Sequence, residues 1–143
     1  MRDLLGDGMR EALVQRMADG PGIECIVAVG PHDVFGPVIS VGIGGIVADR
    51  LRQRPRRALP LTEQDACDLV AEAPIAQVLH DRGLDVDSLV DIVRRMAALA
   101  DAVHELTGLR CNPILVSSTG SAVLSARVAV RPTPTEHLPV RRL

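Results

Sequence analysis

The sequence GIECIVAVGPHDVFGPVISVGIGGIVAD, residues 22–49, decides the fold that we predict for this chain. Its apolar positions are mostly valine and isoleucine, in short runs that glycine and proline interrupt. β-Branched residues favour a pleated, half-buried surface, so we expect three strands in this stretch. The glycine turn at residues 42–45 is where another group, a phosphate or simply a neighbouring strand, can approach the main chain closely, because glycine has no Cβ.

Composition indicates one globular domain with an aliphatic core. The 143 residues are 47% hydrophobic and 24% charged, with one Phe and no Trp or Tyr. The net charge of −2 gives no reason to expect nucleic acid or an anionic membrane as a partner. All sixteen basic residues are arginine, which excludes Schiff-base lysine chemistry and the common phosphate-binding lysine.

The cysteines and the hydropathy pattern exclude several other classes of protein. Cys25, Cys67 and Cys111 are far apart and lack paired spacing, so the sequence predicts neither a zinc site nor a disulfide framework. No run reaches the ~18 apolar residues of a membrane-spanning helix. We therefore expect a cytoplasmic protein with no membrane partner.

Before and after the opening stretch, the chain is polar and charged. Residues 1–11 are interrupted by glycine and predict a loose lead-in, followed by a strand or short helix at residues 12–17. Five arginines lie in the segment from Arg50 to Arg57, with both ends counted. Clustered cations repel one another and prefer water, so this segment indicates a solvated loop or exposed edge, with an anion site as the alternative.

Two helices and a hairpin are expected in the second half. Thr62 is a good N-cap for a helix that stops before Pro74. Apolar residues spaced by three and four predict a second helix from residue 87 or 88 to 107. Strands at 109–117 and 121–130 follow, joined by a turn at 117–120.

The expected fold class follows from this order of elements. It is α+β, with a mainly antiparallel sheet and two helices packed on one face. The domain covers residues 12–130, and residues 131–143 form a proline-rich tail.

Several segments in this order resemble a known family. They are FGPVISVGIGG at 35–45, Asp49, RRALPLTEQDA at 56–66 and CNPILV at 111–116. Together they resemble the C-terminal half of the ATP-grasp domain of ADP-forming (NDP-forming) acyl-CoA synthetases, including those fused to acetyltransferase domains. The resemblance implies an ATP-grasp C-terminal subdomain. In that family a phosphoryl group passes between ATP, a histidine on another domain and an acyl phosphate, ending in acyl-CoA.

The resemblance also implies a nucleotide site. The segment with Gln15 and Met17 leads into the adenine-binding hinge, and Glu24 lies in the nucleotide cleft. The turn with Gly44 and Gly45 and the carboxylate of Asp49 line the phosphate side. ATP or ADP is therefore the implied ligand.

The magnesium site of the family is changed in this chain. The family has an acidic residue two positions before the Asn-Pro pair, the Asn itself, and an Asp on the next strand. Here those positions hold Arg110, Asn112 and Ser125. Of the family's three metal ligands, only Asn112 remains. A fixed cation also repels a divalent ion, so we expect no magnesium site of the family's kind.

Three hypotheses about function remain. The first is a degenerate, non-catalytic half-domain that serves as a binding or structural module, as a homodimer or docked on a larger synthetase or acetyltransferase chain. The second is a residual adenine-nucleotide binder that uses Gln15, Met17, Glu24 and Asn112. The third is a ligase subunit that forms acyl-CoA with ATP once a lysine-bearing N-terminal half completes it. No residue is assigned a catalytic role.

Overall fold

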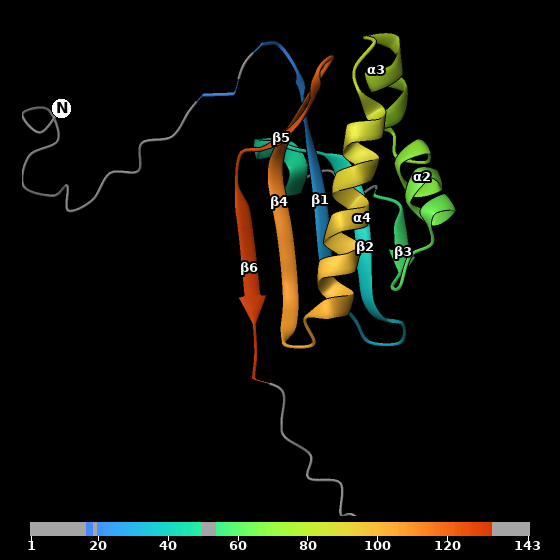
Figure 1. Ribbon diagram of the computed structural model, residues 1–143, viewed down its shortest axis with the longest axis vertical. Coiled ribbons are helices and arrows are strands. Elements are labelled where there is room, and N and C mark those ends of the chain that lie inside the picture. Colours follow the sequence, from blue (N-terminus) through green and yellow to red (C-terminus); the bar gives the residue numbers. More distant parts are fainter. Residues whose placement is uncertain (1–16, 19, 50–53, 133–143) are drawn as a thin grey trace, which may run out of the picture.

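Figure 1 shows a computed structural model of the chain, which describes residues 17–18, 20–49 and 54–132. A single sheet carries its helices on one face. The strands are β1 (Ile23–His32), β2 (Gly36–Ile43), β3 (Arg56–Ala58), β4 (Leu106–Ser117), β5 (Gly120–Val123) and β6 (Ala126–Val130).

The sheet is antiparallel throughout, and β1 lies near its centre. The strand order is β3-β2-β1-β4-β5, and β6 pairs with the same side of β4 as β5 does. β4 comes from the far end of the chain, so its pairing with β1 joins the two halves of the sequence. This pairing places the glycine turn at residues 42–45 within reach of the Asn112-Pro113 pair.

Three α-helices and one 3-10 turn complete the fold. They are α2 (Glu63–Ala71), α3 (Ile75–Asp81), α4 (Val86–Ala102) and η2 (Ile46–Asp49). Thr62 caps α2 as predicted: its side chain accepts a hydrogen bond from the Asp65 amide, and the Asp65 carboxylate accepts one from the Thr62 amide. Among the described residues, no helix has the length and apolar character needed to cross a membrane.

The core lies between the helices and one face of the sheet. Side chains alternate along each strand, so every second residue of β1 points toward the helices. The fully buried core residues include Val27 of β1, Ile39 and Val41 of β2, Ile114 of β4 and Leu89 of α4. The predicted fold class, α+β with a mainly antiparallel sheet, is confirmed.

The first half of the chain differs from the prediction in two details. Residues 22–49 hold two strands and a 3-10 turn instead of three strands, because Gly45 has a φ of 71° and turns the chain after Ile43. The apolar patch after Pro74 folds as a further helix, α3, whose Ile75 and Leu79 are buried. Seven residues are too few for a clear helical period in the sequence.

The second half differs at two boundaries. α4 ends at Ala102, not residue 107, because Val103 is extended and β4 already begins at Leu106. The predicted strand 121–130 is interrupted between β5 and β6. Pro113 on the facing strand has no N–H to donate, and its carbonyl accepts from Leu124 instead of following a regular ladder. The predicted turn between Ser117 and Gly120 is confirmed.

Most of the predicted lead-in and tail lies outside the described residues. The same holds for the strand or helix predicted at 12–17, apart from Met17, and for part of the arginine-rich segment. The domain boundaries at residues 12 and 130 stay predictions.

Candidate functional site

The glycine turn folds back onto the main chain of β1. The Gly44 amide donates a hydrogen bond to the Glu24 carbonyl over 2.8 Å. A Cβ at position 44 would collide with the backbone of Cys25, which no rotamer change can relieve. The close approach that the sequence left open is therefore made at Gly44 by a neighbouring strand.

Asn112 holds the next residue of the turn. Its side-chain Oδ1 accepts a hydrogen bond from the Gly45 amide over 2.8 Å, and its Nδ2 donates to the Gly45 carbonyl over 3.3 Å. The side-chain amide thus pairs with both polar groups of one residue. Two segments on which the family resemblance rests, GIGG and CNP, are joined by these two bonds.

The three positions implied for the metal site lie in one cavity. Arg110, Asn112, Ser125 and Arg127 line a cavity of about 280 Å³. Arg110 of β4 and Arg127 of β6 are direct partners in the strand register. The backbone N–H of Asn112 also donates a hydrogen bond to the Ser125 carbonyl over 3.0 Å, which fixes β4 against the segment between β5 and β6.

Arg127 is the residue of this cavity that sequence reasoning missed. The signal was present in the alternation of strand residues, because positions 125 and 127 share one face of an extended segment, as 110 and 112 do. Using that signal required the pairing of β4 with β6, which the sequence alone does not show.

The cavity does not fit a magnesium ion. Mg²⁺ prefers several oxygen ligands, usually with at least one carboxylate, and the described lining offers two guanidinium groups, a hydroxyl and an amide. Across the part of the chain that the structure describes, no group of three or more His, Cys, Asp or Glu residues is placed to hold a metal. The Asn112 oxygen is also already engaged with Gly45.

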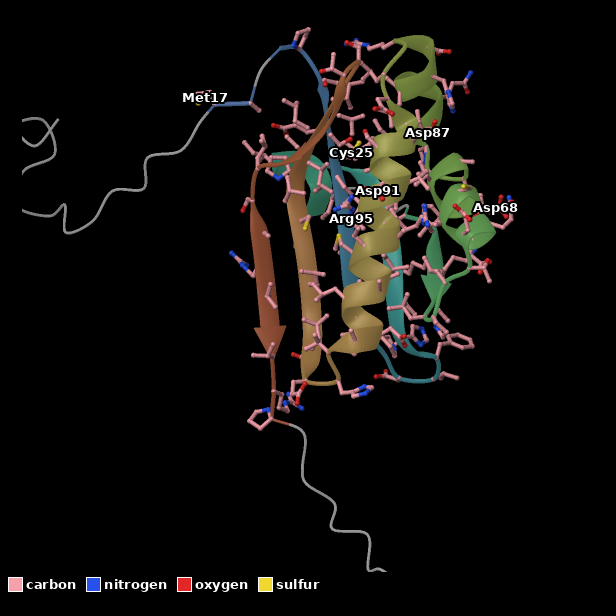
Figure 2. All side chains as sticks on the ribbon, in the orientation of Figure 1. Met17, Cys25, Asp68, Asp87, Asp91 and Arg95 are labelled. Carbon is pink, nitrogen blue, oxygen red and sulfur yellow. The ribbon has the colours of Figure 1, made fainter. Side chains whose placement is uncertain are left out.

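The remaining predicted site residues are not among the described residues that line this cavity. Glu24 is exposed on β1, with a carboxylate oxygen beside Gly45. Met17 is 83% exposed on the segment that leads into β1 (Figure 2) and lines a separate cavity of about 500 Å³ with Leu115 and Leu124. Asp49 ends η2, and its side chain is outside the described part, as is all of Gln15.

The buried cysteines do not add a nucleophile. Burial raises the pKa of the Cys25 thiol to about 12, and burial also raises the pKa of Cys111 above its ordinary value. The thiolate is the reactive form, so both groups are inert near neutral pH. They serve as small apolar side chains of the core.

Comparison with known sequences decides the family. Residues 3–130 match the family described as ATP-grasp domain. This chain belongs to the ATP-grasp family. The match covers every strand and helix of the structure, and it agrees with the segments that carried the resemblance.

The curated relatives are ADP-forming acyl-CoA ligases. The chain is 31% identical over 122 residues to acetate–CoA ligase [ADP-forming] I of Archaeoglobus fulgidus, covering 82% of this chain and 18% of that enzyme. It is 28% identical to the beta subunit of acetate–CoA ligase [ADP-forming] II of Pyrococcus furiosus, covering 78% of this chain and 50% of the subunit. This ATP-grasp chain therefore spans about a fifth of the first relative and half of the second.

Solved structures share the fold. One is a dinucleotide-forming acetyl-coenzyme A synthetase of Ca. Korarchaeum cryptofilum in complex with coenzyme A and Mg-AMPPCP. It matches with a TM-score of 0.74 and 26% identity, over 79% of this chain and 55% of that one. A structure of PH1788 from Pyrococcus horikoshii matches with a TM-score of 0.73 and 27% identity, over 81% and 52% of the two chains.

Proposed function

We propose that this chain is a non-catalytic binding module related to the ATP-grasp region of ADP-forming acyl-CoA synthetases. The observation that carries the proposal is the cavity in which Arg110 and Ser125 occupy the positions implied for acidic ligands. Phosphoryl transfer from ATP depends on divalent ions that neutralise the phosphate oxygens. At an effective dielectric constant of about 20, a unit positive charge about 4 Å away disfavours a divalent cation by about 8 kcal/mol, which is about 4 kcal/mol for each charge of the ion.

The direct test is turnover. The chain is incubated with Mg-ATP, coenzyme A and acetate, and ADP and acyl-CoA are measured, with Asn112→Ala as the paired variant. We expect no product above a blank for either protein. Turnover by the native chain that disappears in Asn112→Ala would contradict the proposal. Turnover found only after mixing with a lysine-bearing ATP-grasp half would favour a ligase subunit completed in trans.

Adenine-nucleotide binding is a second candidate, favoured by the cavity that Met17 lines. Its volume of about 500 Å³ falls within the usual range for small-molecule sites, and it includes the apolar side chains of Leu115 and Leu124. Ser125, the next residue after Leu124, lines the cavity that contains Arg110 and Arg127. A cavity with apolar side chains that suit a base and the cavity lined by Arg110 and Arg127 thus have lining residues next to each other in the sequence.

Calorimetric titration with ADP tests this candidate. We expect saturable heat with the native chain and weaker binding with Leu124→Asp, which places a carboxylate in the cavity that Met17 lines. Absence of heat at millimolar ADP would exclude nucleotide binding by this chain.

Association with another chain is the third part of the proposal. β6 pairs with β4 along one edge, and its Val128 and Val130 are 55% and 66% exposed. Among the described strands, β6 pairs with β4 alone, and such an edge with exposed valines favours pairing with another polypeptide, either a second copy in a homodimer or a larger synthetase or acetyltransferase chain. The naming of two Pyrococcus furiosus relatives as beta subunits supports an assembly of this kind.

Light scattering of the purified chain tests the homodimer. We expect a mass above the 15.3 kDa of one chain, reduced to that value by the double variant Val128→Glu with Val130→Glu. A native chain that stays at 15.3 kDa at high concentration would exclude self-association.

A further inference from the structure

Two arginines face one cavity on the side of the sheet opposite the helices. Arg110 lies between Leu109 and Cys111, whose side chains belong to the helix-covered core, so the strand alternation directs Arg110 to the other face. Arg127 is its direct partner on β6. Ser125 and Asn112 complete the described lining, which is polar throughout.

The register of these strands brings the two cations close together. Directly opposite residues of an antiparallel pair have Cβ atoms about 5 Å apart, and like charges in such a pair are destabilising. Arg127 is exposed and makes no ion pair with any described residue. A bound anion between the two side chains would be attracted by both of them.

The donors of the cavity suit a phosphate group. Each guanidinium has five N–H donors in a planar fork, so a contact made elsewhere still leaves donors that can reach a ligand. The Ser125 hydroxyl adds one donor, and Asn112 has a second Nδ2 hydrogen besides the one that bonds to Gly45. The cavity of about 280 Å³ has room for one or two phosphate groups.

We propose that the cavity of Arg110, Asn112, Ser125 and Arg127 binds a phosphate oxyanion without a divalent cation. Arg110 and Arg127 hold the anion from two strands, in the place where a carboxylate-lined site would hold a metal. The proposal rests on the proposed function in one respect, the absence of a metal from this cavity. The phosphate can belong to a free anion or to a nucleotide.

Calorimetry in the presence of EDTA tests the proposal, with inorganic phosphate, pyrophosphate and ADP as probes. We expect pyrophosphate to bind the native chain and Arg127→Gln to weaken this binding by at least about tenfold, the loss of a charged hydrogen bond. Arg110→Gln serves as the second variant and is expected to show a similar loss. Arg131→Gln removes the same charge from the residue that follows β6, outside the lining, and is expected to change affinity by less than about twofold.

Added magnesium separates this site from a metal-dependent one. Mg²⁺ should weaken pyrophosphate binding, because the magnesium complex of the ligand carries less negative charge. Tighter binding of ADP than of pyrophosphate would identify a nucleotide as the source of the phosphate, and equal affinities would identify a free anion.

Two results would overturn the inference. No binding of any probe in EDTA would overturn the anion site and leave the proposed non-catalytic function standing. Binding that requires magnesium would overturn both.

Discussion

Gly44 and Asn112 determine how the glycine turn sits on the sheet. One residue permits contact with the backbone of Cys25, and the other pairs with both polar groups of Gly45. Neither contact involves a ligand. These residues therefore hold the glycine turn in place beside the positions of Arg110 and Ser125.

Substitution of Gly44 tests the backbone contact. Gly44→Ala should lower the free energy of unfolding by about 1–3 kcal/mol or more, because the added Cβ meets main-chain atoms that cannot move aside. Gly30→Ala is the matched control on β1, since a Cβ there meets nothing within 4 Å. Its effect should stay within about 0.5 kcal/mol. Urea unfolding followed by circular dichroism measures both, and equal costs would show that the contact at Gly44 is not tight.

Among the helices and strands, α4 shows most clearly how one apolar face stabilises the fold. Leu89 is fully buried against the sheet, whereas Leu99, on the same helix, is 44% exposed. The sequence period predicted this helix, because burial of a stripe of side chains and the helical repeat coincide over many residues.

A pair of leucine substitutions measures how much more the buried face of α4 stabilises the fold than its exposed face. Leu89→Ala should cost about 2–5 kcal/mol of unfolding free energy, since it leaves a cavity in the core. Leu99→Ala should cost less than about 1 kcal/mol. Thermal or denaturant unfolding compares them, and a larger loss for Leu99→Ala would place the buried face of α4 elsewhere.

The start of α2 gives a pH-dependent contribution. Hydrogen bonds from the side chain and backbone of Thr62 lower the pKa of Asp65 below its ordinary value. A carboxylate with a depressed folded-state pKa stabilises the fold above its unfolded-state pKa and loses this effect as the pH falls through the folded-state value.

Asp65→Ala should therefore lower the melting temperature at about pH 7, and the difference from the native chain should shrink at about pH 2.5. Asp33→Ala, in the exposed turn between β1 and β2, is the control and should show a smaller difference at neutral pH. A difference for Asp65→Ala that stays constant across this range would mean that its ionised carboxylate is not the stabilising group.

At the scale of the whole molecule, the sequence predicted the class of fold better than its boundaries. Valine and isoleucine runs broken by glycine specified an antiparallel sheet, and the cap at Thr62 specified a helix start. The interruption between β5 and β6 was not predictable, because it depends on Pro113 of a different strand. The tight packing of Gly44 against β1 was not predictable either, because it depends on how the chain after β2 turns back onto the backbone of Cys25.

The candidate site was predictable in part for the same reason. The resemblance to the acyl-CoA synthetase family singled out Arg110, Asn112 and Ser125, and the structure places all three in one cavity. Arg127 depends on the register of β6 against β4, and the engagement of Asn112 with Gly45 depends on a contact across the sheet. Both features support the anion site that we propose for this cavity.

Manganese binding tests the central claim most directly. Mn²⁺ is titrated into the native chain and into the double variant Arg110→Glu with Ser125→Asp, with ADP present, and bound ion is measured by electron paramagnetic resonance. We predict no bound Mn²⁺ in the native chain and a bound signal in the double variant, whose added carboxylates supply the missing ligands. Stoichiometric Mn²⁺ bound by the native chain would contradict the account.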